Sequence, residues 1–145
     1  MTEMQNEKIR WLSRARKAEH KLKALHCVRK RDDLLIRELE AFEDCAELYR
    51  HLQEIELQTR QQLILLAGIR DEIRTAIETL PDLQLQAVMD RKYLAYQTNE
   101  QIAEAMYFEV RTIQRKHKKA LDLLTLPDKS RISETTIFQN ITCEN

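Results

Sequence analysis

Glycine and proline are almost absent from this chain, which has one glycine and two prolines among 145 residues. Average usage of about 7% glycine and 5% proline would supply roughly ten glycines and seven prolines. Tight hairpin turns and phosphate-binding loops depend on these residues, so β-sandwiches, barrels and glycine-rich nucleotide folds are disfavoured. Charged residues make up 33% of the chain and hydrophobic residues 43%, a balance typical of helices with long solvated faces. The composition therefore predicts an all-α protein.

The formal net charge is zero, with 24 basic and 24 acidic residues, but the charges are unevenly distributed along the chain. Residues 1–31 hold ten basic and three acidic side chains, whereas residues 32–62 hold three basic and nine acidic ones. Residues 91–124 are again basic, with seven basic against four acidic side chains. Such blocks indicate helices that pair within the chain or separate surfaces for partners. We expect the basic N-terminal helix to pair with the acidic stretch from Asp32 to Glu56, with contact to DNA phosphates as the alternative.

The chain shows no apolar run near the roughly 18 residues that a membrane span requires. Its charged N-terminal residues lack the apolar segment of a secretory signal. The three cysteines, Cys27, Cys45 and Cys143, are far apart and form no Cys-x-x-Cys pair, so they are interpreted as reduced thiols. We therefore expect a soluble cytoplasmic protein that has no membrane contact, no metal and no cofactor.

The N-terminal part, residues 1–76, carries apolar stripes at helical spacing. The first stripe predicts one helix from Glu3 to Arg31 and comprises Trp11, Ala15, Ala18, Leu22, Leu25 and Val28. The basic side chains predicted to lie off this stripe are Lys8, Arg10, Arg14, Lys17, Lys21 and Lys23. We expect Asp32 and Asp33 to cap a further helical segment, whose apolar stripe begins with Leu35, Leu39, Phe42, Ala46 and Tyr49. A second, cleaner stripe comprises Leu66, Ile69, Ile73, Ala76 and Leu80. The pattern predicts an elongated helical hairpin or coiled coil and leaves open whether Asp32 to Leu80 is one helix or two.

Residues 77–125 have the pattern of a compact group of short helices. Pro81 marks the strongest break in the chain, and the helix that follows it ends between Tyr93 and Gln97. Thr98 and Gln101 form a capping box that begins another helix, and a break follows at Tyr107. The inner face of the last helix is predicted from its spacing to comprise Val110, Ile113, His117, Ala120, Leu121 and Leu124. Among these residues, His117 is expected to be a packed core histidine rather than a metal ligand. Residues 126–145 are expected to form a loose tail.

The outer face of that last helix is polar and basic. Two short helices, the second with a basic outer face, are what a helix-turn-helix requires, because the second helix enters the major groove. Arginine can bind guanine, glutamine can read adenine, and lysine mostly contacts phosphate. The side chains expected to bind DNA are Arg111, Thr112, Gln114, Arg115, Lys118 and Lys119.

From Ile77 to Leu124 the chain resembles region 4 of sigma-70-type factors, a likeness that covers about a third of its length. The segments that carry the resemblance are Leu80-Pro81, Arg91-Lys92-Tyr93-Leu94, Glu100-Gln101-Ile102-Ala103, Arg111-Thr112-Ile113 and Ala120-Leu121-Asp122-Leu123-Leu124. The closer likeness is to small phage regulators of the RinA and ArpU type, whose Tyr-x-x-x-x-Thr-Ile/Val-x-Arg-x-His pattern is matched by Tyr107, Thr112, Ile113, Arg115 and His117. The resemblance implies activation of late phage genes or a related transcriptional control, in the nucleoid of a bacterial host cell.

The chain departs from this pattern at two turns. Tyr107 stands where such motifs often have glycine, so it must either adopt a positive φ or use a different turn. Tyr96 stands at a similar position in the preceding loop. Nothing in the chain resembles sigma region 2, so a complete sigma factor is not expected.

The sequence thus predicts a DNA-binding transcriptional regulator, which the resemblance assigns to a phage or prophage and whose N-terminal helices serve dimerisation or contact RNA polymerase. One alternative is a helical adaptor that binds RNA polymerase or another protein without reading DNA. Another is a DNA-recognising packaging protein similar to a terminase small subunit. An enzyme is not expected, because no nucleophile elbow, phosphate loop, metal-ligand spacing or catalytic triad is present.

Overall fold

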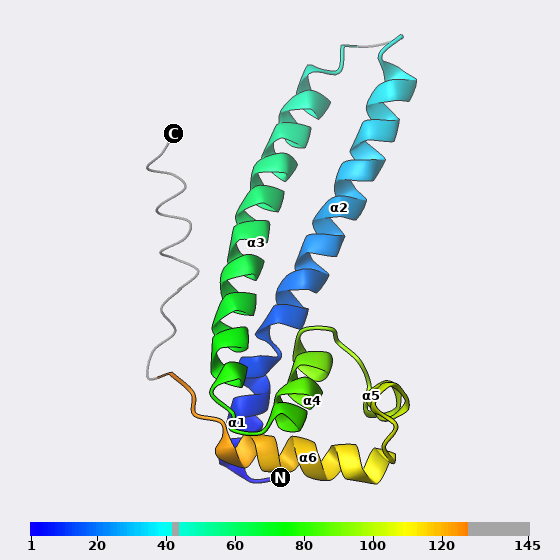
Figure 1. Ribbon diagram of the computed structural model, residues 1–145. Coiled ribbons are helices and arrows are strands. Elements are labelled where there is room, and N and C mark those ends of the chain that lie inside the picture. Colours follow the sequence, from blue (N-terminus) through cyan, green and yellow to red (C-terminus); the bar gives the residue numbers. More distant parts are fainter. Residues whose placement is uncertain (42–43, 128–145) are drawn as a thin grey trace. The chain divides into compact units, whose positions relative to one another are not determined.

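The computed structural model describes residues 1–41 and 44–127, and these residues form α-helices without any strand (Figure 1). The all-α prediction is confirmed for this part of the chain. The described helices are α1 (Glu3–Leu12), α2 (Arg14–Leu39), α3 (Ala46–Glu78), α4 (Leu83–Tyr93), α5 (Asn99–Met106) and α6 (Val110–Leu123).

The contacts between residues divide the chain into two compact units. Among the described residues, the first unit combines Met1–Lys17 with residues 68–127, so it contains α1, the C-terminal part of α3, and α4, α5 and α6. The second unit comprises Ala18–Ala67, which are most of α2 and the N-terminal part of α3. The first residues of the chain therefore fold together with its last described helices.

The second unit is a pair of antiparallel helices, with α2 beside α3 (Figure 1). Near its base, the Gln62 side-chain amide donates to the Ala18 carbonyl at 3.0 Å. Further along the pair, Arg29 lies 3.4 Å from Glu56, and His51 Nδ1 lies 2.6 Å from Asp32 Oδ2. As the residue number on α2 increases in these three contacts, the number of the contacting residue on α3 decreases. This is the order expected of an antiparallel helical hairpin. The Arg29–Glu56 pair joins the basic block to the acidic block, in the sense expected from the charge distribution.

Two predictions for this hairpin are wrong. Asp32 and Asp33 do not cap a new helix, because α2 continues through them to Leu39, and Asp32 instead faces His51 on α3. The apolar stripe expected to begin at Leu35 is not buried: Leu35 is 43% exposed and its neighbour Ile36 is 5% exposed. The predicted stripe includes Leu39 at the end of α2 and Ala46 at the start of α3, and its register does not continue from one helix into the other.

The helix expected from Glu3 to Arg31 is broken once, at Ser13. Ser13 has φ −80° and ψ −2°, and its backbone N–H still bonds to the Ile9 carbonyl. The interruption therefore keeps a helical hydrogen bond while it turns the chain, which explains why apolar spacing alone did not indicate it. The apolar stripe itself is largely confirmed, since Ala15, Ala18 and Leu22 are buried.

The core of the first unit is formed where α4, α5 and α6 meet. Residues of these helices with at most 1% of their surface exposed are Leu85, Val88, Met89, Ile102, Ile113, Ala120 and Leu121. The break at Pro81 is confirmed, and Asp82 caps α4 by accepting from the Gln84 backbone N–H at 2.8 Å. The capping box of Thr98 and Gln101 at the start of α5 is also confirmed. The stripe on α3 that begins at Leu66 is buried at all five positions. Beyond Pro127, the predicted tail lies outside the residues that the structure describes.

Candidate nucleic-acid interface

Helix α6 has one buried and one exposed face. The predicted inner residues Ile113, His117, Ala120, Leu121 and Leu124 are each at most 5% exposed, which confirms that face; Val110 is half-buried. On the opposite side, the side chains of Arg111, Gln114, Arg115, Lys118 and Lys119 are exposed, and Thr112 is half-buried. Of the six residues expected to bind DNA, five thus lie on the solvent side of α6 and Thr112 lies at its edge.

The remaining basic residue of α6, Lys116, belongs to the packing of the unit. Its Nζ donates to Gln84 Oε1 on α4 at 2.8 Å and lies 5.3 Å from the ring centre of Phe108. Asp122, the acidic residue of α6, accepts from the Gln5 side chain on α1 at 2.7 Å. The exposed positive charge of the helix is therefore concentrated in Arg111, Arg115, Lys118 and Lys119.

The connection from α5 to α6 turns at Tyr107, which has φ 59° and ψ 40° in the left-handed region. Its backbone N–H bonds to the Ala103 carbonyl, and the next residue, Phe108, bonds to the same carbonyl at 3.0 Å. A residue with a Cβ pays about 1–2 kcal/mol for this conformation, since Cβ crowds the backbone. The ring of Tyr107 is 94% exposed, whereas Phe108 packs against the core. Of the two turn geometries considered for Tyr107, the structure has the one with positive φ.

Tyr96, the other residue at a position where glycine was expected, also has a positive φ, 58°. Unlike Tyr107, its side chain is engaged, because Arg70 on α3 donates to its hydroxyl oxygen at 3.0 Å and to the Leu94 carbonyl at 2.9 Å. The guanidinium of Arg70 also lies 5.9 Å from the centre of the Tyr96 ring. These contacts hold the loop between α4 and α5 in place.

A buried polar pair joins α4 to α6. The hydroxyl of Tyr93 lies 2.6 Å from Nε2 of His117, and both residues are almost completely buried. Burial, together with the charge of Lys92, lowers the pKa of His117 to about 4, and burial raises the pKa of Tyr93. Both groups are therefore neutral at pH 7, with the phenol available to donate to the imidazole. This pairing confirms the expectation of a packed core histidine.

Helix α1 contacts the C-terminal end of α6. Lys8 Nζ donates to the Leu121 carbonyl at 2.7 Å, and the Lys8 side chain is 9% exposed. A cation at this end of a helix satisfies a free carbonyl and opposes the negative end of the helix dipole. The prediction that Lys8 lies off the apolar stripe is wrong. Lys8 precedes the buried Leu12 by four residues and Ala15 by seven, so the helical spacing already placed it on that face.

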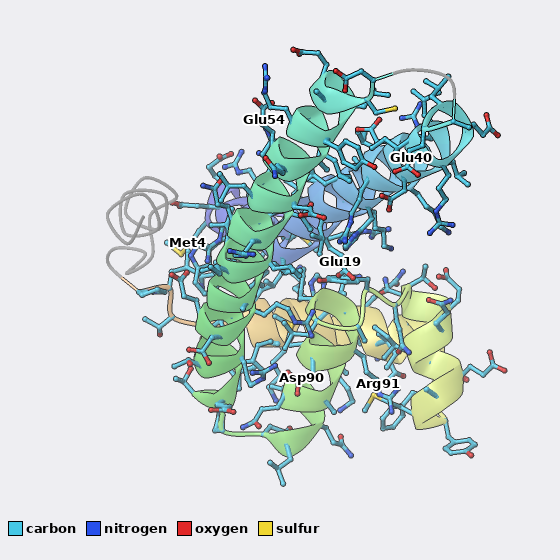
Figure 2. All side chains as sticks on the ribbon, turned by 90° about the horizontal axis from the view of Figure 1, so that it is seen from above. Met4, Glu19, Glu40, Glu54, Asp90 and Arg91 are labelled. Carbon is cyan, nitrogen blue, oxygen red and sulfur yellow. The ribbon has the colours of Figure 1, made fainter. Side chains whose placement is uncertain are left out.

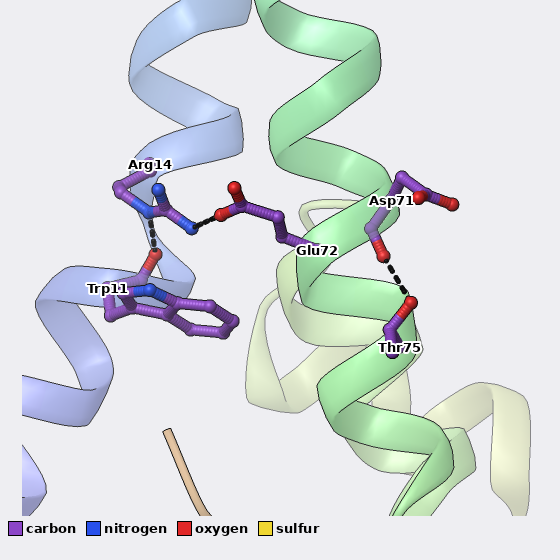
Figure 3. Close-up of polar contacts among 5 residues, drawn as sticks. All are labelled: Trp11, Arg14, Asp71, Glu72 and Thr75. Atoms are coloured by element: carbon purple, nitrogen blue, oxygen red, sulfur yellow. Dashed lines mark hydrogen bonds and ion pairs between the residues drawn. The ribbon is translucent and has the colours of Figure 1, made fainter. Parts of the chain in front are cut away.

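The junction of α1 and α2 is tied to the C-terminal part of α3 through Arg14 (Figure 3). Arg14 Nε donates to the Trp11 carbonyl at 2.9 Å, and its terminal nitrogen lies 2.7 Å from Glu72 Oε2. The guanidinium lies 4.6 Å from the centre of the Trp11 ring. Sequence reasoning missed this contact, because residues 14 and 72 share no local pattern.

No helix within residues 1–41 and 44–127 combines the length and the apolar character needed to cross a membrane. Among the described residues, neither the exposed Cys27 nor the buried Cys45 forms a disulfide, and Cys143 lies outside them. No family model matches the chain, and no curated protein and no solved structure is significantly similar to it, so its function must be inferred from the geometry of α4, α5 and α6.

Proposed function

We propose that the protein binds duplex DNA sequence-specifically through the outer face of α6 and thereby regulates transcription. The observation that carries the proposal is the separation of this helix into a buried apolar face and an exposed face with two arginines and two lysines. Without a positively charged surface a protein cannot neutralise the phosphates that dominate DNA affinity. In this protein the positive charge is carried by exposed side chains of α6.

The arrangement of α5 and α6 supports a helix-turn-helix. Helix α5 has 8 residues, α6 has 14, and Tyr107, Phe108 and Glu109 lie between them. A helix of 14 residues is about 21 Å long, which suits insertion into the major groove. Its inner face packs on α4 and α5, so α6 would enter the groove as part of a rigid unit.

The exposed side chains divide by chemistry. Arg111 and Arg115 are one helical turn apart, so both would reach base edges on the same side of the helix, where arginine pairs with guanine through two hydrogen bonds. Gln114 would read adenine, while Lys118 and Lys119, further along the helix, would contact phosphates. Thr112 is half-buried and would contact the backbone or a thymine methyl at the groove edge.

The resemblance of residues 77–124 to sigma region 4 and to RinA- and ArpU-type regulators supports the same role. It extends the proposal to control of phage or prophage genes in the nucleoid of a bacterial host. Contact with RNA polymerase, or dimerisation, would then be assigned to the N-terminal helices.

The proposal is tested by selecting binding sites from a random duplex library and measuring affinity for the enriched site by gel shift. We expect Arg111→Ala and Arg115→Ala each to cost about 1–3 kcal/mol and to relax specificity at one base position. Lys119→Ala should weaken binding to all sequences and lower the slope of log K against log salt by about 1. Arg10→Ala removes an exposed arginine from α1 and is the matched control, which should bind as the wild type does.

Two results contradict the proposal. One is a library from which no duplex is enriched at low salt. The other is a double variant, Arg111→Ala with Arg115→Ala, that binds the enriched site as tightly as the Arg10→Ala control. If the double variant still captures RNA polymerase while the wild type enriches no DNA, the protein is an adaptor instead.

A further inference from the structure

A cleft of about 720 Å³ opens on the first unit, next to the buried pair of Tyr93 and His117. Ile9 and Ser13 form its wall on the side of α1, and Gln114 and Lys118 form the wall on α6. Clefts of about 300–1,000 Å³ are the size that holds small-molecule ligands. The proposed DNA-binding role needs no such cleft, since a groove-reading helix acts through its exposed face.

The charged residues of this cleft are all basic. Arg16, Lys92 and Lys118 line it, and no Asp or Glu does. Neither Arg16 nor Lys118 forms an ion pair with any residue that the structure describes. Lys92 donates to Asn99 Oδ1 at 2.7 Å, and burial lowers its pKa although Glu100 acts in the opposite direction. Three cations from different segments, with one of them half-buried, favour an anionic ligand.

A second cleft on the same unit contains both basic and acidic residues, so the purely basic lining is particular to the first cleft. It measures about 400 Å³ and is lined by Arg70, Arg74 and Arg91 together with Glu78 and Asp90. Asp90 and Arg91 are neighbours on α4 (Figure 2). The arginines of the second cleft are accompanied by carboxylates, whereas the basic residues of the first cleft are not.

The uncharged residues of the larger cleft match a nucleoside. Gln97, Asn99 and Gln114 line it with three amide side chains. The amide oxygens of Gln97 and Asn99 already accept from Arg91 and Lys92, whereas the exposed Gln114 offers the paired donor and acceptor that a base edge requires. Tyr96 adds an aromatic ring, which Arg70 holds by its hydroxyl, and aromatic rings stack on bases of any sequence. An inorganic anion has no base edge to pair with an amide and no ring to stack on Tyr96.

We propose that this cleft binds a nucleoside monophosphate. Its phosphate lies among Arg16, Lys92 and Lys118, and its base lies against Tyr96 and the amide side chains. Gln114 and Lys118 also belong to the proposed DNA surface, so a bound nucleotide lowers DNA affinity. This regulatory consequence rests on the proposed function, whereas the nucleotide site itself does not.

The site is tested by isothermal titration calorimetry of the full chain at constant ionic strength. The probes are the four ribonucleoside 5′-monophosphates, the corresponding nucleosides and inorganic phosphate. We expect at least one nucleotide to bind with a Kd below about 1 mM, and at least about tenfold more tightly than its nucleoside or inorganic phosphate. Arg16→Gln and Lys92→Gln should each weaken that binding by about tenfold or more, and Arg74→Gln, outside the cleft, should not change it.

The proposal is overturned if no nucleotide binds, if a nucleoside binds as tightly as its nucleotide, or if inorganic phosphate does. It is also overturned if Arg16→Gln binds like Arg74→Gln. Arg16 is exposed, so its variant tests the site even if Lys92→Gln fails to fold.

A competition assay with fluorescent duplex tests the regulatory consequence. A saturating nucleotide should weaken DNA binding at least about fivefold, and DNA should weaken nucleotide binding by the same factor. A nucleotide that binds without changing DNA affinity overturns the regulation alone. Absence of DNA binding without nucleotide overturns the proposed function and leaves the calorimetric result standing.

Discussion

Acid should destabilise the first unit through one residue, His117. This side chain is 5% exposed, and burial holds its pKa near 4 instead of the usual 6.5. The unfolded chain takes up a proton as the pH falls through 6.5, while the folded chain stays neutral until about pH 4, so stability present at pH 7 is lost between these values. Integration over this window gives a loss of about 2 kcal/mol at pH 5 and about 3 kcal/mol at pH 4.

The measurement is urea unfolding between pH 7.5 and 4.5, followed by the fluorescence of Trp11. This residue is the one tryptophan of the chain and lies in the same unit as His117. The reference protein is His117→Gln, whose amide can still bond to the Tyr93 hydroxyl but does not titrate. The carboxylates and the other three histidines are common to both proteins, so they cancel in the difference between the two free energies of unfolding.

We expect the wild type to lose its advantage over His117→Gln as the pH falls, by about 2 kcal/mol between pH 7.5 and 5. A difference between the two proteins that stays constant across this range would refute the reasoning. It would mean that the pKa of His117 is the same in the folded unit as in the unfolded chain, as for a hydrated imidazole.

Three further substitutions test the packing of the first unit by thermal or urea unfolding. Tyr107→Gly should raise the free energy of unfolding by about 0.5–1 kcal/mol, because the exposed ring makes no contact that offsets its left-handed backbone; an unchanged stability would contradict the strain argument. Lys8→Met should lower it by about 1.5–3 kcal/mol through loss of the bond to the Leu121 carbonyl, whereas exposed Lys17→Met is the control and should change little. Ile113→Ala should cost about 2–5 kcal/mol as a large-to-small change at a fully buried position, and a cost below about 1 kcal/mol would show that this face of α6 is not packed.

Local rules predicted the helices of the first unit well. The break at Pro81, the capping box that begins at Thr98 and the change of direction at Tyr107 each depend on a few adjacent residues. The two faces of α6 follow from helical spacing alone, and the buried and exposed positions match that spacing. A structural feature that depends only on neighbouring residues can therefore be predicted from the sequence.

Contacts between distant segments were not accessible in this way. The predicted stripe that begins at Trp11 indicates that the N-terminal helix has a covered face, but not that α1 packs on α6, since an apolar stripe does not identify the element that covers it. For the same reason the Arg14–Glu72 pair could not be found. The error at Leu35 has another origin, because heptad-like spacing was continued through an interruption that lacks glycine and proline. The cleft combines residues from α1, α2, α4, α5, α6 and the loop between α4 and α5, so it exists only in the folded unit.

The docking of α1 on α6 also sets the order in which the protein can fold during its synthesis. Lys8 leaves the ribosome early, but its partner Leu121 is added 113 residues later. The helix pair of the second unit has all its residues once Ala67 has emerged, so it can form while α6 is still untranslated. Helix α1 must wait with its apolar face exposed to solvent or to chaperones until translation has passed Leu124. Helix α1 is thus made before α6 but reaches its place only after α6 has been made.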